Sequence, residues 1–160
     1  MAKINGVELK SKRPIKNGSE EGFGAFIYMD NERIGTVKDE ADGFGIQIRI
    51  PKTRDEILFR YRTDDYTKSL KYFIRRLIEL NDIEKCFKNE TKKTNTAFEL
   101  IEIQKIDTET EMPKSAIDLY LVKKGSSNER IEELKREGVE FDSVNVFTSL
   151  NDFNVNVVNA

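Results

Sequence analysis

The stretch GFGAFIYMDNERIGTVKDEADGFGIQIRI, residues 22–50, decides the first half of the fold. It predicts three strands joined by two turns, because apolar residues alternate with polar ones and Asn, Asp and Gly interrupt them. The first strand is apolar on both faces. Phe26 and Tyr28 lie on one face, and the other face consists of Phe23, Ala25, Ile27 and Met29. Such a strand is usually central, with both faces covered. A return strand over 34–38 and an alternating strand over 44–50 follow it.

The spacing of apolar residues changes after Pro51. Residues 53–56 match a capping box, and 57–62 form either a short helix or a strand. A longer helix is expected to begin at Asp64 or Asp65. Its apolar stripe consists of Leu70, Phe73, Ile74, Leu77 and Ile78.

The C-terminal part of the chain predicts a strand–helix–strand unit. A short apolar run over 117–122 is typical of a buried strand, and a helix capped by Ser126 and closed by Gly138 follows it. A last strand over 144–147 completes a βαβ candidate, and 97–106 adds a further strand or helix. We therefore expect an α+β fold, with an antiparallel N-terminal sheet packed on a long helix and a βαβ-like C-terminal portion. One domain is expected over 1–160, β-rich in 1–51, helical in 53–92 and α/β in 97–160.

The composition excludes several classes of enzyme. The chain of 160 residues contains no histidine and one cysteine, Cys86. A Ser-His-Asp or Cys-His arrangement, a histidine-containing zinc site and a thiolate metal site are therefore excluded. Carboxylate or lysine chemistry, an oxygen-ligated metal or no catalysis remain, and we expect no enzyme, no cofactor and no metal.

The same features suggest a cytoplasmic setting. A single cysteine cannot form an internal disulfide, and the N-terminus MAKINGVELKSK has no apolar leader. No apolar run approaches the roughly 18 residues of a membrane span, so we expect no membrane partner. The net charge of −2 is unevenly distributed, because residues 1–76 hold 16 of the 27 basic and 12 of the 29 acidic residues. A dipolar protein of this kind orients a partner but does not favour nonspecific DNA binding.

A basic set around the long helix is the first candidate binding surface. Basic and tyrosine side chains interleave there, as at protein hot spots and in nucleic-acid interfaces. The alternative interpretation is an ordinary solvated helix face. The set consists of Arg60, Arg62, Lys68, Lys71, Tyr72, Arg75 and Arg76.

Gly125, Ser126 and Ser127 form a second, weaker candidate between a strand and a helix. Free backbone N–H groups at such a junction can bind an anion such as phosphate. The spacing of a dinucleotide-binding or P-loop motif is absent, so an ordinary helix cap is the favoured alternative.

Metal-dependent chemistry ranks last. Asp39, Glu40 and Asp42 gather at one turn, but EF-hand spacing is absent and a solvated turn is the favoured interpretation. A metal-dependent nuclease would need a convergence of acidic groups and lysine that the sequence does not indicate.

Two parts of the chain carry a resemblance. The opening GF-x-A-x-I-Y-x-D-N with the return strand IGTV, and the ending LYLVKKG followed by a charged helix and VNVFTSLNDF, resemble small uncharacterised accessory proteins. Those proteins belong to Gram-positive bacteria, their plasmids and phages, and the resemblance implies a mobile-element setting without implying an activity. We therefore expect a non-enzymatic binding protein, such as an inhibitor of a host defence or nucleic-acid enzyme. A protein partner is the first expectation, nucleic-acid binding by residues 60–76 is the alternative, and the oligomeric state stays open.

Overall fold

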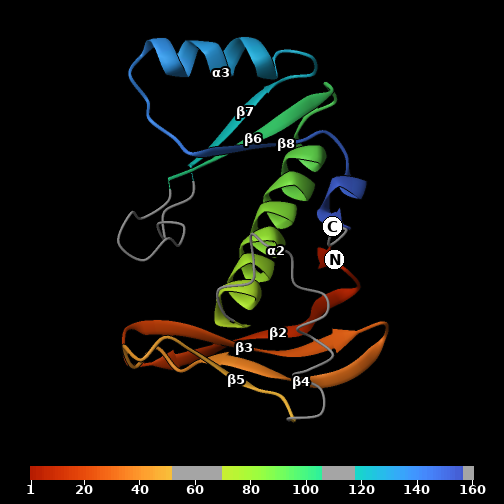
Figure 1. Cartoon of the computed structure of the whole chain (residues 1–160), viewed down its shortest axis with the longest axis vertical. Coiled ribbons are helices and arrows are strands. Elements are labelled where there is room, and N and C mark those ends of the chain that lie inside the picture. Colours follow the sequence, from red (N-terminus) through yellow and green to blue (C-terminus); the bar gives the residue numbers. More distant parts are fainter. Residues whose placement is uncertain (52–69, 106–117, 157–160) are drawn as a thin grey trace. The chain divides into compact units, whose positions relative to one another are not determined.

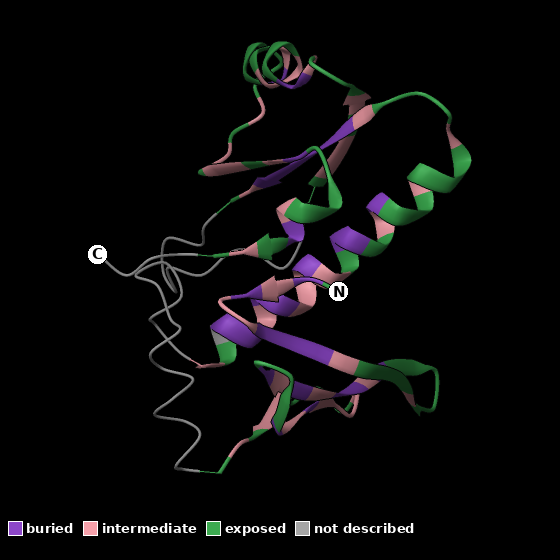
Figure 2. Cartoon of the chain, turned by 90° about the vertical axis from the view of Figure 1, so that its right-hand side faces the viewer, coloured by how far each residue is buried: buried purple, intermediate pink, exposed green. Residues whose placement is uncertain are grey.

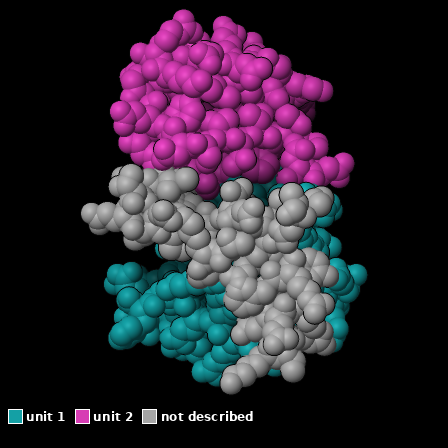
Figure 3. Space-filling model, in the orientation of Figure 1, with its two compact units in different colours: residues 1–84, 153–160 teal, residues 85–152 magenta. Residues whose placement is uncertain are grey.

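A computed structural model describes residues 1–51, 70–105 and 118–156 of the chain. The chain divides into two compact units, residues 1–84 with 153–160 and residues 85–152 (Figure 3). The chain passes between the units twice, within a long helix at residues 84–85 and within a short 3-10 helix at residues 152–153. The subdivision expected near residues 52 and 95 stays a prediction. That the chain folds as a single domain stays a prediction.

Unit 1 contains a six-stranded sheet in the order β5-β4-β3-β2-β1-β9 (Figure 1). Neighbouring strands are antiparallel from β5 to β1, whereas β1 and β9 are parallel. The expected antiparallel N-terminal sheet is confirmed, and β3 lies in its interior. The strands are β1 (Lys3–Ile4), β2 (Val7–Asn17), β3 (Glu20–Met29), β4 (Glu32–Asp39), β5 (Ile46–Arg49) and β9 (Asn154–Val155).

Tight turns set the registers of the N-terminal strands. Asn5 and Gly6 have φ angles of 48° and 78°, and Asp30 and Asn31 have φ angles of 50° and 68°. Two successive positive φ values match the right-handed twist of a hairpin, and asparagine, aspartate and glycine accept them at low cost. The Asn5-Gly6 pair is a strong hairpin signal in the sequence, and it occupies the two-residue turn between β1 and β2.

Strand β2 is longer than its sequence suggests. It continues through Pro14 to Asn17, because a β-bulge between Lys10 and Arg13 reorients the strand before the proline. Ser11 within the bulge has a φ angle of 57°. Residues 15–22 therefore belong mostly to β2 and β3, with a short turn at residues 18–19 between them.

Helix α2 (Leu70–Lys93) follows the sheet, and its first 15 residues belong to unit 1. Figures 1 and 2 show that α2 rises from one side of this sheet, with its N-terminal end nearest the strands. Lys12 on β2 and Asp82 on α2 form an ion pair of 3.0 Å on that side. The expected packing of sheet and helix is confirmed, although its expected start at Asp64 or Asp65 lies outside the described residues. The fully buried residues of the helix in this unit are Phe73, Ile74, Leu77, Leu80 and Ile83.

Phe44 departs from the predicted alternation. Strand β5 begins only at Ile46, and the Phe44 side chain is 80% exposed. Gly43 and Gly45 on either side have φ angles of 86° and 75°, which turn the backbone away from an extended strand.

Unit 2 contains a three-stranded sheet in the order β7-β6-β8, formed by β6 (Phe98–Gln104), β7 (Asp118–Lys123) and β8 (Ser143–Phe147). Both outer strands are antiparallel to β6, so β7 and β8 are parallel to each other. Helix α3 (Ser127–Arg136) connects them, which confirms a βαβ-like portion with β6 inserted between its strands. Arg130 on this helix lies 5.5 Å from the Tyr120 ring centroid, and Leu134 is buried.

The end of unit 2 leads back to unit 1. The last part of α2 lies in unit 2, where Phe87 and Phe98 pack with ring centroids 4.8 Å apart. A short 3-10 helix, η2 (Leu150–Phe153), precedes β9. The α+β class is thus as expected, and within the described residues no helix combines the length and apolar character needed to cross a membrane.

Candidate functional site

The side of the unit 1 sheet opposite α2 carries cationic and aromatic side chains. Strand alternation places Ala25, Ile27 and Met29 in the core, where they are buried, and Phe26 and Tyr28 on the opposite side, where they are half-buried. We call this side the cation–aromatic face. It consists of Lys3, Lys10, Arg13, Phe26, Tyr28, Arg33, Lys38 and Arg49.

Sheet registers arrange these residues in three rows across the strands. The first row runs from Lys3 through Glu8 and Tyr28 to Arg33. A second runs from Lys10 through Phe26 and Thr36 to Arg49, and a third from Arg13 through Gly24 and Lys38 to Gln47. Each row therefore combines cations from different strands, and aromatic rings occupy β3 in two of the rows.

Cations lie over both aromatic rings of the face. The Arg33 guanidinium carbon is 3.8 Å from the Phe26 ring centroid, and the Arg13 guanidinium carbon is 5.9 Å from it. The Lys10 ammonium is 4.6 Å from the Tyr28 ring centroid. Such contacts contribute roughly 0.5–1 kcal/mol each at exposed sites, and they hold the long cationic side chains close to the sheet.

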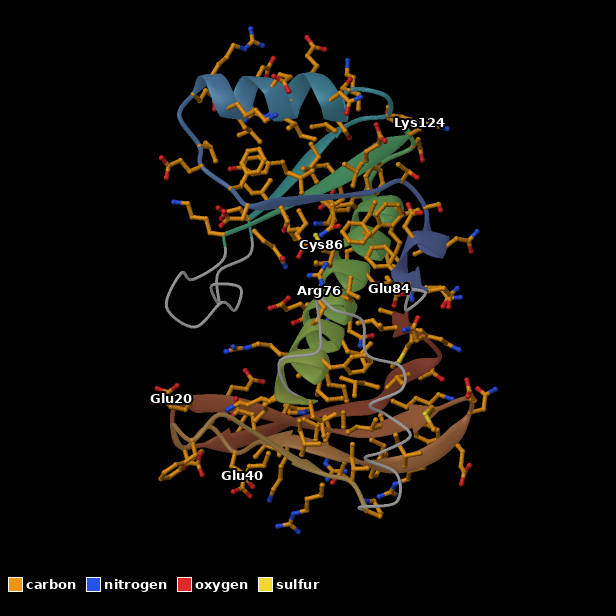
Figure 4. All side chains as sticks on the ribbon, viewed as in Figure 1. Glu20, Glu40, Arg76, Glu84, Cys86 and Lys124 are labelled. Atoms are coloured by element: carbon orange, nitrogen blue, oxygen red, sulfur yellow. The ribbon has the colours of Figure 1, made fainter. Side chains whose placement is uncertain are left out.

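Carboxylates neutralise only part of this face. The buried Glu8 carboxylate pairs with the ammonium groups of Lys3 at 3.5 Å and Lys10 at 3.1 Å. Glu40 pairs with Lys38 at 2.7 Å (Figure 4). Arg13, Arg33 and Arg49 are exposed, and within the described residues none of these three arginines forms an ion pair. The face therefore keeps a positive surplus in a chain whose net charge is negative.

The two sides of β3 are covered in different ways. The sequence predicted that something covers each side of this strand, since both sides are apolar. In the described part of the chain, Phe26 and Tyr28 stay half-buried beneath cations from β2 and β4. The basic residues of β2 and β4 do not alternate along the chain, because bulges interrupt both strands, so no simple period of two marks this face in the sequence.

Residues of the predicted basic set have different environments. Lys71 on α2 is exposed and Arg75 is half-buried, while Tyr72 lies within the helix and its side chain is not described. Arg60, Arg62 and Lys68 lie outside the described residues. The structure thus brings Lys71 and Arg75 to one helix but gives no geometry for the set as a whole.

The Arg76 side chain is buried and ion-paired rather than exposed on the surface. It is 7% exposed, and its guanidinium contacts the Glu79 carboxylate at 3.2 Å (Figure 4). This corrects its inclusion in a surface set, because Arg76 occurs only two positions after the buried Ile74 and next to Leu77 on the core side of the helix.

Part of the predicted anion site at Gly125, Ser126 and Ser127 is used for hydrogen bonds within the chain. The Gly125 N–H donates a hydrogen bond to the carboxylate of Glu99 on β6, which is itself buried. Among the described residues, Ser126 occupies the N-cap of α3 without a side-chain capping hydrogen bond, and the buried Ser127 hydroxyl has no hydrogen-bond partner. The Gly125 N–H is thus used by an internal carboxylate, and the Ser126 N–H donates to the Lys123 carbonyl oxygen at 3.0 Å, so neither donor is left for an external anion.

The acidic turn after β4 has a conformational role. Asp39 accepts a hydrogen bond from the Ala41 N–H at 2.8 Å, and Asp42 accepts one from the Phe44 N–H at 3.1 Å. These are the local bonds by which aspartate stabilises turns. Among residues 1–51, 70–105 and 118–156, no group of three or more potential metal-ligating Cys, Asp or Glu residues comes together.

Comparison with known proteins gives no relative. No protein-family model, curated protein or solved structure matches this chain.

Proposed function

We propose that this is a non-enzymatic binding protein that engages an anionic macromolecule through the cation–aromatic face. One observation supports this proposal above the others. Arg13, Arg33 and Arg49 are exposed on one side of a sheet without ion pairs among the described residues, and the Arg33 guanidinium is held over Phe26. Arginine and aromatic residues are enriched where proteins bind macromolecules, and an arginine held in place loses less conformational entropy on binding.

The resemblance in sequence extends this proposal to a setting. That setting is a mobile element of Gram-positive bacteria. The single cysteine cannot form an internal disulfide, and we propose a cytoplasmic location. The specific proposal is an inhibitor that binds a host defence or nucleic-acid enzyme, either on an acidic surface or through its nucleic acid. The cation–aromatic face replaces residues 60–76 as the proposed binding surface, because its geometry is described and its arginines are exposed.

A capture experiment with matched baits tests the proposal. The tagged chain, an Arg33→Glu/Arg49→Glu variant and a Lys85→Glu/Lys124→Glu control would be expressed at native level in the organism that carries the gene. Both variants change the net charge equally, and the control lysines are exposed residues of unit 2. We expect a specific partner with the wild type and the control, and its loss with the Arg33→Glu/Arg49→Glu variant. A partner captured equally by all three baits would contradict the role of this face.

A further inference from the structure

We infer that the occupant of the cation–aromatic face is single-stranded nucleic acid. This inference rests on the proposed function and adds the chemical class of its partner. The backbone phosphates would contact the cations of the rows, and a base would stack on the outer side of the Arg33 guanidinium.

The distribution of charge supports an extended polyanion. Rows follow each other every second residue, so they lie about 7 Å apart along the strands. Arg33, Arg49 and Arg13 belong to three different rows, and each lacks an ion pair within the described part of the chain. A single small anion could contact one of these arginines at a time, whereas a chain of phosphates can contact all three.

The stacked arginine supports recognition of bases. The Arg33 guanidinium lies 3.8 Å from the Phe26 ring centroid, so one side of the cation is occupied by the ring. Arg33 as a whole is exposed, so its side chain remains accessible to a ligand from solvent. Unpaired bases stack on guanidinium planes as they do on aromatic rings, whereas carboxylates contact only guanidinium edges. An acidic protein would therefore leave this feature of the face unused.

The width of the face favours a single strand over a duplex. The three arginines of the face lie on β2, β4 and β5, so they extend over four adjacent strands, β2 to β5. At about 4.8 Å between neighbours, these strands span roughly 14 Å between their outer backbones. The major groove of B-DNA is about 12 Å wide and admits a helix or a two-stranded ribbon. Bases of a duplex would also be unavailable to Arg33.

Fluorescence anisotropy with the full chain tests this inference. Four labelled probes would be compared at low salt: a 20-nucleotide mixed-sequence single strand, its duplex, an abasic strand of equal length and a polyglutamate peptide. We expect the single strand to bind at least about tenfold more tightly than the other three probes. Its affinity should fall about 10- to 100-fold between 50 and 200 mM salt, as for a few phosphate contacts.

Three variants assign the binding to the face. Arg33→Glu/Arg49→Glu should weaken single-strand binding at least about tenfold, while Lys85→Glu/Lys124→Glu should change it by less than about threefold. Arg33→Lys keeps the charge but removes the plane, so it should reduce the preference for the mixed strand over the abasic strand. Circular dichroism and thermal melting of each variant would establish that it is folded.

Several outcomes would overturn the inference and still leave the proposed function to its own test. These are equal binding of the duplex, equal binding of polyglutamate, or no binding of any probe at low salt. If the capture experiment then returned a partner that depends on Arg33 and Arg49, the proposed function would stand with an acidic protein as its partner. A captured partner that does not depend on these residues would instead refute the proposed function.

Discussion

The Arg33 guanidinium on β4 covers the Phe26 ring on β3, with 3.8 Å between the guanidinium carbon and the ring centroid. The two residues are diagonal neighbours rather than direct partners, because Arg33 is paired with Tyr28 and Phe26 with Thr36. A bulge between Ile27 and Tyr28 adds one residue to β4 at this point. Arg33, which the proposed binding requires, thus also packs against the sheet.

Removing this contact should lower stability slightly. Arg33→Ala uncovers one side of Phe26, and we expect a loss of about 0.5–1 kcal/mol in the free energy of unfolding. Arg49→Ala is the matched control, since Arg49 is an exposed arginine of the same face and should change stability by less than about 0.5 kcal/mol. Urea denaturation of both variants measures the difference. Equal losses would indicate that the Arg33–Phe26 contact contributes nothing.

Arg76 should behave as a structural residue. Arg76→Ala removes the partner that Glu79 has at 3.2 Å, and both side chains are largely buried. Leaving a buried charge without this partner should cost about 3 kcal/mol. Lys71→Ala, one turn and a half earlier on the same helix, should change stability by less than about 0.5 kcal/mol because Lys71 is exposed. Thermal and urea unfolding of the Arg76→Ala and Lys71→Ala variants measure the two losses in stability. Equally small losses would contradict a structural role for Arg76.

Glu99 should stabilise the turn before α3. Its carboxylate accepts the hydrogen bond from the Gly125 N–H, so Glu99→Ala leaves that donor without this acceptor. We expect a loss of about 1–2 kcal/mol, with Glu99→Gln retaining part of the stability because an amide oxygen still accepts. The melting temperatures of the two variants provide the comparison. A Glu99→Gln variant as unstable as Glu99→Ala would show that the charge matters more than the hydrogen bond.

Asp152 should make stability depend on pH. Burial raises the pKa of its carboxyl, but hydrogen bonds from the Thr148 and Ser149 N–H groups and the Thr148 hydroxyl outweigh this and lower the pKa below its usual value. A lowered pKa in the folded state means that the ionised group stabilises the fold above its unfolded pKa. That contribution is lost as the pH falls through the folded pKa.

The corresponding measurement is a pH series of unfolding experiments. Asp152→Ala should be less stable than the wild type by about 1 kcal/mol at pH 7, and the difference should shrink below about pH 4. Asp118→Ala, which removes an exposed carboxylate in the same unit, should show a small difference at every pH. A constant Asp152→Ala difference from pH 7 to pH 3 would contradict the assigned cause.

Local sequence patterns predicted the helices and strands better than they predicted which strands pair with each other. The helical spacing of Phe73, Ile74 and Leu77 identified α2, because burial of one helix face leaves a periodic trace in the sequence. The order β7-β6-β8 left no such trace, since pairing between residues 100 and 147 depends on contacts between distant segments. The alternation at Phe44 was misleading because the two neighbouring glycines have positive φ angles.

The candidate surface was harder to predict than the fold. Lys10, Arg33 and Arg49 are far apart in sequence, and only the sheet registers bring them to one side. The basic set around Arg76 was prominent because its members are close together in the chain. Closeness in sequence does not distinguish an exposed arginine from a buried one. Arg76 belongs to this set by sequence, yet it is buried.

The parallel pairing of Lys3 with Asn154 has a consequence for the order of folding. Hairpins β2–β3 and β3–β4 can form from adjacent residues, but β1 and β9 can meet only after a loop of about 150 residues has closed. Closure entropy grows with loop length, and contacts of this range form slowly. The β1–β9 pair should therefore be the last part of the six-stranded sheet to gain protection from hydrogen exchange during refolding.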